Sequence, residues 1–452
     1  AAIEVWESLR PGLTDASKIA IFETQTQTYR FLQHSLVAQN RTNDALEIAE
    51  RGRARAFVEL LAQCQSSNPN NQKTIKPPTI QQIKLIAKTQ KATLVQSSTI
   101  ENQLIYIWVV KPTGEVAFKQ VNLKSLETPL TELVTNSRES IGVRSRGLLV
   151  VGSGENAQAT ATQRLQQLHQ ILIQPIAQFL PTDPNSRVIF IPQSSLFLVP
   201  FAALQDEQGK YLIEKHTILT APAIQVLELT HQQRQRLRAQ SLTSLQGKDA
   251  LVMGNPTMPS IPDSTGKLQK LANLPGAETE ANAIAKLLNT QAMIGASATK
   301  AAILPKLTSA RIVHLATHGL LEDFKNLGLP GAIALAPSGN DNGLLTASEI
   351  FDLKLNAELV VLSACDTGRG DIKGDGVVGL SRSLISAGVS SIIVSLWSVP
   401  DAPTASLMTE FYRQIQQNSD KATSLRNAML TTMKQHPDPK DWAAFTLIGE
   451  AE

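Results

Sequence analysis

The two stretches that decide the fold are RIVHLATHG (residues 311–319) and LVVLSACDTG (residues 359–368). Each begins as an unbroken run of β-branched and apolar residues, which is typical of a strand covered on both faces. Helical patterns lie between such runs, so we predict right-handed crossover connections and a parallel sheet. Because chemistry in such sheets lies at the carboxyl ends of the strands, His318 and Cys365 are predicted to project from one edge.

The same alternation of strands and helices extends over residues 246–452. It predicts further strands at ALVMGNP and SIIVSLWSVP, and helices at ETEANAIAKLLN, GVVGLSRSLISAG, PTASLMTEFYRQIQQ and ATSLRNAMLTTMKQ. The fold class of this region is therefore α/β, with a mostly parallel sheet flanked by helices.

The first half of the chain is predicted to be a helical hairpin followed by a mixed α/β region. Apolar residues at three- and four-residue spacings predict two helices, and residues 1–64 are interpreted as the end of a tetratricopeptide-like array. Residues 65–80 are polar and rich in Pro and Asn, which indicates a linker. Residues 81–245 are the α/β region, with three strands expected within residues 92–123.

The composition limits the classes of protein to which the chain can belong. Its 452 residues suit two or three domains, and its net charge of +3 argues against general attraction to nucleic acid or a membrane. Two cysteines fit a reducing compartment, and no apolar run reaches the roughly 18 residues of a membrane span. We therefore expect a soluble, cytoplasmic, multidomain protein. The chain opens inside a helical pattern, which indicates a piece of something longer.

An imidazole and a thiol at one sheet edge would form a nucleophilic pair. The thiolate is the reactive form of cysteine, and His318 is suited to take the proton of Cys365. An attacked carbonyl also needs donors for its developing oxyanion, and the backbone N–H groups of Gly319 and Cys365 are the candidates. The two residues are about 50 positions apart, as in caspase-type cysteine proteases.

Several segments around these residues resemble CHAT domains, which are caspase-like peptidase domains related to separase and commonly attached to tetratricopeptide repeats. They are LPGAETEANAIAKLL, HLATHG, LVVLSACDTG and GDGVVGLSRSLISAGVSSIIVSLWSVPD. Upstream, IPQSSLFLVPFAAL and ALEIAERGRARAFVELL are similar to sequences that lead into CHAT domains of bacterial, especially cyanobacterial, proteins. The resemblance spans most of residues 28–450. It implies a caspase-like fold at 246–452, and it allows the region before that to be a degenerate caspase-like half, as in separases.

The resemblance also implies an activity, namely that of a cysteine endopeptidase without a cofactor. His318 would be the general base, Cys365 the nucleophile and Gly319 part of the oxyanion hole. The segment 395–399 would line the substrate cleft and pair with a protein substrate bound as an extended strand. The helical repeats would bind a regulatory protein. The alternative is a regulatory interaction scaffold whose caspase-like domain is inactive or latent.

Four residues are candidates for the substrate cleft: Ser395, Trp397, Asp366 and Asp401. Trp397 is either a core aromatic residue or a hydrophobic wall of the cleft. The two aspartates would supply negative charge to the pocket for the residue before the scissile bond, and separase relatives prefer a basic residue there. Asp401 is equally suited to cap the helix that begins near Pro403.

Other motifs are predicted to be structural. His314 and His318 are four residues apart on a strand rather than a helix, so we expect no metal site and interpret His314 as a packed, hydrogen-bonded residue. Cys64 is predicted to lie in the core. No glycine pattern has the strand-to-helix context of a nucleotide loop, so no nucleotide cofactor is expected.

Two basic runs complete the candidate features. The first, on the helix ERGRARAF, is interpreted as a solvated, salt-bridged face and comprises Arg51, Arg53 and Arg55. The second, in HQQRQRLRAQ (231–240), is interpreted as a solvated linker or exposed helix and comprises Arg234, Arg236 and Arg238. If the substrate pocket takes Arg or Lys, this second run also offers self-processing sites.

Overall fold

The chain forms two compact units. The computed structural model describes residues 2–8, 13, 15–64, 75–142, 155–240, 249–262, 266–320, 331–363, 371–373, 376–397, 400–417 and 420–452. The first unit contains Ala1–Leu229 and Ile372–Val377, and the second contains Thr230–Asp371 and Val378–Glu452. Within the described ranges, no helix combines the length and hydrophobicity needed to traverse a lipid bilayer.

The first unit is built on a sheet with the strand order β3-β2-β1-β4-β5. Strand β1 pairs in parallel with β4, and β4 with β5, whereas β2 and β3 are antiparallel additions. The strands are β1 Ala92–Ile100, β2 Leu104–Val110, β3 Val116–Asn122, β4 Arg187–Ile191 and β5 Thr217–Thr220. The three strands predicted within residues 92–123 are therefore confirmed. Every residue of β1 is buried, as expected when both faces of a strand are covered.

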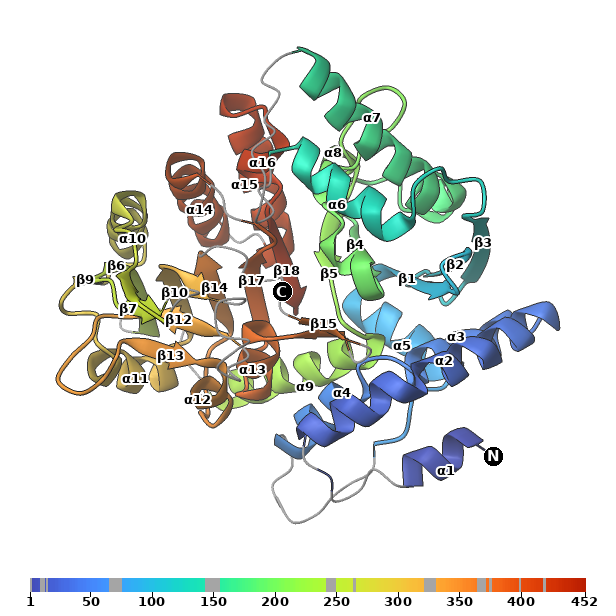
Figure 1. Ribbon diagram of the computed structural model, residues 1–452, viewed down its shortest axis with the longest axis horizontal. Coiled ribbons are helices and arrows are strands. Elements are labelled where there is room, and N and C mark those ends of the chain that lie inside the picture. Colours follow the sequence, from blue (N-terminus) through green and yellow to red (C-terminus); the bar gives the residue numbers. More distant parts are fainter. Residues whose placement is uncertain are drawn as a thin grey trace. The chain divides into compact units, whose positions relative to one another are not determined.

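Helices cover both faces of this first sheet, with α2 to α5 on one side and α6 and α7 on the other (Figure 1). The helical segments are α1 Ala2–Ser8, α2 Asp15–Ala38, α3 Thr42–Arg51, α4 Arg55–Cys64, α5 Ile80–Gln90, α6 Leu130–Ser140, α7 Glu155–Leu172, η1 Gln174–Phe179, η2 Ser194–Leu198, η3 Phe201–Ala203 and α8 Leu212–Lys215. Helix α5 starts where the sequence supplies a capping box: Thr79 Oγ1 accepts from the Gln82 N–H, and the Gln82 carboxamide accepts from the Thr79 N–H.

The N-terminal helical hairpin is formed by α2 and α3, which pack against each other. The sequence pattern predicted one continuous second helix, but the structure breaks it between α3 and α4. A Cβ atom on Gly52 would lie only 2.8 Å from Cβ of buried Tyr29, so a glycine is needed for this close approach. Two residues later Ala54 has a φ of 45°, which helical backbone does not allow.

The break changes the surroundings of the first basic run and of Cys64. Arg53 and Arg55 are only 5% and 4% exposed, so the predicted solvated face is wrong for both. They turn inward because the chain leaves the helix just before them. Arg51 stays on α3 and pairs with Glu7. The predicted core position of Cys64 is also wrong, because this last residue of α4 is exposed.

The second unit is built on a sheet with the strand order β18-β17-β14-β10-β6-β9. All neighbours are parallel except β18, which pairs antiparallel to β17. The strands are β6 Ala250–Pro256, β9 Ala292–Gly295, β10 Ile312–Ala316, β14 Leu359–Ser363, β17 Ser391–Ser395 and β18 Phe445–Gly449. Strands β10, β14 and β17 are buried throughout, which agrees with their unbroken apolar patterns.

Helices α10, α14 and α15 cover one face of the second sheet, and α11, α12 and α13 cover the other (Figure 1). The helices are α10 Pro275–Leu287, α11 Lys300–Ser309, α12 Ala347–Phe351, α13 Leu380–Ser386, α14 Asp401–Gln416, α15 Lys421–Gln435 and α16 Pro439–Trp442. The predicted α/β class, with a mostly parallel sheet flanked by helices, is confirmed.

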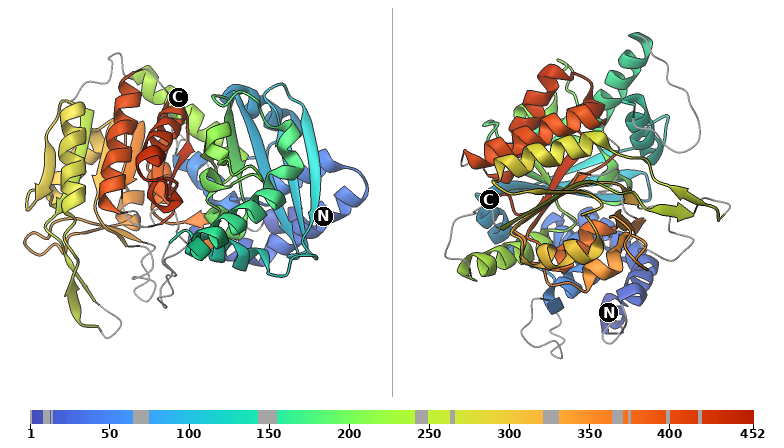
Figure 2. Two further views of the ribbon diagram at one scale, coloured as in Figure 1. Left: turned by 90° about the horizontal axis from the view of Figure 1, so that it is seen from above. Right: turned by 90° about the vertical axis from the view of Figure 1, so that its left-hand side faces the viewer.

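Short strands decorate the second unit. They are β7 Ser260–Pro262 and β8 Leu268–Lys270, which form a hairpin, and β11 Gly319–Leu320, β12 Ala332–Ala334 and β13 Leu344–Thr346, which form a small antiparallel sheet. A further pair, β15 Asp371–Lys373 and β16 Gly376–Val378, lies mostly within the residues Ile372–Val377 of the first unit. Figure 2 shows the β7–β8 hairpin projecting from the body of the unit. The segment that returns from this hairpin leads directly into α10.

The second basic run lies on α9 (Ile224–Gln240). Arg234 is 4% exposed, and its Nη1 lies 3.1 Å from Glu452 Oε2 and 3.6 Å from Glu450 Oε2. The interpretation as a solvated linker is therefore wrong for Arg234, whereas Arg236 and Arg238 are exposed. A peptidase that binds its substrate as an extended strand would need part of α9 to unfold before cutting here.

Candidate active site

Strands β10 and β14 are neighbours, and their last residues lie side by side. The register pairs Ala316 with Ser363. His318 follows two residues after the first of these, and Cys365 follows two residues after the second. Since paired strands are about 4.8 Å apart, the two strands end side by side at the same level of the sheet. The predicted adjacency of the two strands is confirmed, while Cys365 and Asp366 lie outside the described residues.

The ring of His318 is oriented by a backbone carbonyl. Its Nε2 lies 2.8 Å from the carbonyl oxygen of Ala272, in the segment between β8 and α10. A carbonyl can only accept a hydrogen bond, so Nε2 carries the hydrogen. In the neutral ring Nδ1 is then the basic nitrogen. The side chain is partly exposed, as a base that meets a substrate must be.

Backbone pairing fixes the residues on either side of this ring. Thr317 Oγ1 donates to the Ala334 carbonyl at 2.9 Å, and the Ala334 N–H donates to the His318 carbonyl at 3.0 Å. This second bond makes Gly319 and Ile333 a non-hydrogen-bonded pair of the β11–β12 ladder. The Gly319 N–H is therefore directed away from β12, as an oxyanion donor would need to be.

His314 lies within β10, four residues before His318, and its side chain belongs to the interior. It is 0% exposed, and its Nε2 lies 2.9 Å from Glu280 Oε1. The Tyr412 hydroxyl lies 3.3 Å from its Nδ1, and burial together with the Glu280 charge raises the pKa of Tyr412 well above its usual value. His314 is thus the packed, hydrogen-bonded residue that the sequence predicted. Across the described ranges, His, Cys, Asp and Glu do not gather into a metal-binding group.

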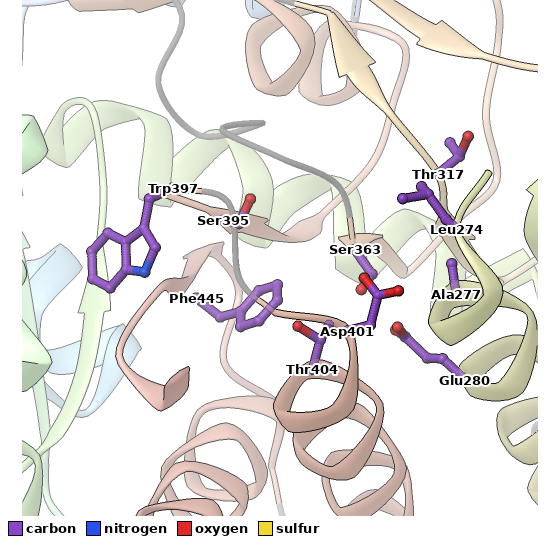
Figure 3. Close-up of a pocket in the computed structure, with 10 residues that line it drawn as sticks. All are labelled: Leu274, Ala277, Glu280, Thr317, Ser363, Ser395, Trp397, Asp401, Thr404 and Phe445. Atoms are coloured by element: carbon purple, nitrogen blue, oxygen red, sulfur yellow. The ribbon is translucent and has the colours of Figure 1, made fainter. Parts of the chain in front are cut away.

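A small pocket of about 40 Å³, room for a few water molecules, lies beside these strand ends. Its lining comes from the strand ends and from α10 and α14 (Figure 3), and comprises Leu274, Ala277, Glu280, Thr317, Ser363, Ser395, Trp397, Asp401, Thr404 and Phe445. Figure 3 shows the carboxyl groups of Glu280 and Asp401 directed towards its middle. The described lining residues include two carboxylates and no Lys or Arg.

One of these polar groups lacks a partner. The Ser363 hydroxyl is buried, and it makes no hydrogen bond to any described residue. A buried hydroxyl without a partner costs about 1–3 kcal/mol, so a group that enters the pocket gains by bonding to it.

Asp401 is the first residue of α14, but it caps a different helix. Its Oδ2 accepts from the Gly276 N–H at 3.2 Å, at the start of α10. A Cβ atom on Gly276 would clash with Cβ of Asp401, so glycine is required there. The predicted cap of its own helix is therefore wrong, because its carboxylate bonds to an N–H of α10 instead. The same side chain lines the pocket.

The segment that was expected to pair with a substrate is already paired up to Leu396. Ser395 lies opposite Phe445 of β18, and the Leu396 N–H donates to the Ala444 carbonyl at 2.8 Å. Strand β14 occupies the other edge of β17. Addition of a peptide strand to β17 itself is thus blocked, because both of its edges are filled. Of the rest of the segment 395–399, residues 398 and 399 lie outside the described ranges.

Trp397 is a core aromatic residue that also borders the pocket. It is 1% exposed, and its Nε1 donates to the Lys440 carbonyl at 2.9 Å, which makes it a core aromatic residue. It also lines the pocket, on the far side of Ser395 from Asp401 (Figure 3).

Sequence reasoning missed the groups that hold the segment of the Ala272 carbonyl. Asn255, at the end of β6, accepts from the Leu274 N–H through Oδ1 at 2.8 Å and donates to Glu278 Oε2 through Nδ2 at 3.0 Å. A backbone carbonyl leaves no trace in a side-chain pattern. The only signal was Asn255 itself, placed after Gly254 at the carboxyl end of a predicted strand.

Solved structures with a similar fold include two of the separase–securin complex of Saccharomyces cerevisiae. The first aligns with a TM-score of 0.57 and 11% identity, and covers 98% of this chain and 38% of that chain. The second has a TM-score of 0.52 and 11% identity, and covers 95% of this chain and 36% of that one. At this identity the likeness concerns the fold alone, and it defines a caspase-like, separase-related architecture.

The CHAT domain family model matches residues 162–450. The chain belongs to the CHAT domain family, as its resemblance predicted. It is also similar to tetratricopeptide repeat protein 28 of Mus musculus, with 26% identity over 99% of this chain, and to that of Homo sapiens, with 25% identity over 99%. The chain spans 23% of the length of each of these two relatives.

Proposed function

We propose that this chain is a cysteine endopeptidase in which His318 is the general base and Cys365 the nucleophile. The observation that carries the proposal is the register of two neighbouring strands, which end side by side at Ala316 and Ser363, each two residues before one of the proposed catalytic residues. The orientation of His318 supports it, because the Ala272 carbonyl leaves Nδ1 as the basic nitrogen. A base oriented by a third group is the usual arrangement beside an activated nucleophile.

The reaction needs only these two side chains and water. His318 takes the proton from the thiol, and the thiolate of Cys365 bonds to the carbonyl carbon while the C=O electron pair moves onto oxygen. The tetrahedral intermediate then expels the amine, which receives the proton from the imidazolium. Water, deprotonated by His318, attacks the thioester and releases the thiolate, which recovers the proton. The sum is hydrolysis of one peptide bond.

The Gly319 and Cys365 backbone N–H groups are proposed to hold the oxyanion. The direction of the Gly319 N–H, away from β12, supports this role. Removing one such donor typically costs about 10²- to 10³-fold in kcat.

The pocket is proposed to receive a basic side chain before the scissile bond. Asp401 and Glu280 supply its negative charge, and the uncompensated hydroxyl of Ser363 offers an acceptor for a guanidinium or ammonium N–H. Asp366 is a further candidate carboxylate. The extended substrate would pair within the segment 395–399 beyond the end of β17, since β17 itself is paired on both edges.

The helical hairpin is proposed to continue a repeat array that binds a regulatory protein. Both relatives carry the name tetratricopeptide repeat protein, which supports such an array. The same name favours a second candidate function, a regulatory scaffold whose caspase-like domain is latent. The two functions differ in whether His318 activates Cys365.

Labelling with a thiol-reactive peptide that carries Arg next to its warhead tests this directly. The chain has two cysteines, and exposed Cys64 serves as an internal reference thiol. We expect Cys365 to label faster than Cys64 at neutral pH, and His318→Ala to slow only the labelling of Cys365, by about 100-fold or more. Equal rates with and without His318 would support the scaffold, and a Cys365→Ala protein that still cuts a protein substrate would exclude the peptidase mechanism.

A further inference from the structure

We infer that Asn255 is a positioning residue that sets the tautomer of His318, an inference that rests on the proposed function for its catalytic meaning. The link runs from the Asn255 side chain to the Leu274 N–H, and from this segment to the Ala272 carbonyl. Asn255 bonds to the backbone of Leu274, a residue of the pocket lining, and it acts on His318 by fixing the acceptor that the imidazole meets.

The Ala272 carbonyl is held from both sides. On one side the Leu271 N–H donates to the Pro259 carbonyl at 3.0 Å, at the base of the β7–β8 hairpin. On the other side the Leu274 N–H donates to Asn255 Oδ1 at 2.8 Å. The first bond is backbone to backbone. Apart from the bond of His318 itself, Asn255 therefore contributes the side-chain hydrogen bond nearest in sequence to this carbonyl among the described contacts.

The carboxamide of Asn255 is itself oriented without ambiguity. One partner is an N–H, which can only donate, and the other is the carboxylate of Glu278, which accepts at 3.0 Å. Only one orientation of the amide satisfies both. Asn255 also has a φ of 43°, a left-handed conformation that asparagine tolerates better than most residues.

The end of β6 is pressed against α10, so the geometry of this link has little freedom. A Cβ atom on Gly254 would clash with the Ala277 carbonyl. The register of β6 against β9 also shifts between Gly254 and Pro256, which turns Asn255 out of the ladder and towards α10. The path of the chain and its packing against α10 thus direct the side chain of Asn255 towards the segment whose Ala272 carbonyl orients His318.

The ¹⁵N spectrum of the histidine rings tests the inference without any need for activity. In the parent protein we expect His318, identified by its loss in His318→Gln, to be the Nε2–H tautomer when neutral. Asn255→Gly keeps the backbone conformation and removes the carboxamide, so we expect a mixture of tautomers. We also expect kcat/KM to fall by about 10- to 100-fold, as a base displaced by about 1 Å loses much of its effect.

Two variants separate this role from general damage to the fold. Asn289→Gly is the matched control, because Asn289 also has a left-handed φ, 51°, and follows the same helix α10 at its other end. It should leave the His318 tautomer unchanged. Asn255→Asp alone places two carboxylates next to each other and should disturb the tautomer of His318. Combining Asn255→Asp with Glu278→Gln should restore the tautomer, because the carboxylate at position 255 then accepts from both the Leu274 N–H and the carboxamide at position 278.

The outcomes distinguish the two proposals. The positioning role is overturned if His318 keeps a single Nε2–H tautomer in Asn255→Gly. It is also overturned if the double variant Asn255→Asp with Glu278→Gln does not recover that tautomer. A tautomer that shifts as expected in a protein whose Cys365 reacts independently of His318 supports the positioning role and overturns the peptidase.

Discussion

The carboxyl ends of the parallel strands are closed in the first unit and open in the second. In the first, Arg53 donates to the Pro192 carbonyl just after β4 and to the Ser97 carbonyl of β1. In the second, the corresponding ends of β10, β14 and β17 border a pocket. The same edge of a parallel sheet thus anchors a helical hairpin in one unit and borders a pocket with polar lining residues in the other.

Closing the edge of the first unit requires buried charge. Arg53 and Glu50 are 5% and 3% exposed, and burial lowers the pKa of Arg53 to about 10. Burial likewise raises the pKa of Glu50, against the opposing effects of the Gln225 N–H and the Arg53 charge. Such a pair adds little net stability, but breaking it leaves one charge uncompensated. The hairpin is therefore tied to one position on this sheet.

The second unit places two groups of charges at the amino ends of its strands. Arg311 and Glu358 precede β10 and β14 and pair with each other. Glu450 follows β18 beside the start of β17, where it meets Arg234 and Lys421. These two groups lie away from the pocket, whereas buried Glu280 joins α10 to His314 of β10 and also lines the pocket. Most of the buried charge of the second unit is therefore placed at the end of the sheet opposite to the pocket.

The largest expected effect compares a histidine at the open edge, His318, with a buried histidine of the same sheet, His314. We expect His318→Ala to lower kcat/KM by about 10³-fold with little change in stability, since its ring makes one bond and is partly exposed. His314→Ala should do the reverse, because it leaves Glu280 buried without its partner and costs about 3 kcal/mol. Peptidase assays and thermal unfolding of both variants provide the comparison. If the kcat/KM of the His318→Ala protein stayed within tenfold of that of the parent, His318 would not be the catalytic base.

The second effect tests the closed edge. Arg53→Met leaves the carbonyls of Ser97 and Pro192 without their donor and removes a positive charge that acts on buried Glu50, so we expect the first unit to lose about 3 kcal/mol. Adding Glu50→Gln removes the stranded charge and should recover part of the loss. Arg41→Met, in an exposed ion pair of the same hairpin, should cost less than about 1 kcal/mol.

Hydrogen exchange measured by mass spectrometry locates this loss. Peptides from β1 and β4 should lose protection in Arg53→Met, while peptides from β10 and β14 should keep it. Unchanged protection in β1 would mean that Arg53 does not anchor the hairpin.

The sequence predicted the open edge far better than the closed one. Unbroken apolar runs specify strands covered on both faces, and alternation with helices specifies parallel neighbours. His318 was therefore placed correctly at a strand end from pattern alone. The burial of Arg53 was missed because a helical pattern counts side chains at regular spacings and does not register a break such as the one at Gly52.

The contacts of the candidate site were less predictable than its residues. Asp401 bonds to Gly276, and His318 to the carbonyl of Ala272, each across a long stretch of chain. Spacing rules describe neighbours on one helix or strand, and such partners share neither. The pairing of both edges of β17 could likewise not be predicted from spacing, because the strand that pairs with Ser395 lies near residue 445.

The third effect concerns the charges at the amino ends of the second unit. Burial, with the nearby charge of Arg234, lowers the pKa of Lys421 to about 8, although Glu358 and Glu450 oppose this. The unfolded chain keeps that proton up to about pH 10.5, so stability should rise as pH increases from about 8 to about 10.5 and be lost as pH falls back through 8.

Lys421→Met should abolish this rise, changing the difference in unfolding free energy from the parent by on the order of 2 kcal/mol across the window. Urea unfolding at several pH values measures it. Lys286→Met, on the exposed surface of α10, is the control and should follow the parent. If the difference in unfolding free energy between Lys421→Met and the parent did not change with pH, burial would not lower the pKa of this lysine.

The smallest effect separates the two uses of Asp401, which clasps α10 and lines the pocket. Asparagine keeps an oxygen to accept from the Gly276 N–H but removes the charge, so Asp401→Asn should unfold like the parent. For a substrate with Arg before the scissile bond, KM should rise about tenfold, which corresponds to about 1.4 kcal/mol. Asp420→Asn, at the cap of α15, is the matched control and should change neither property. If KM for the Arg substrate stays constant while stability falls, Asp401 serves the fold alone and the pocket takes its charge from elsewhere.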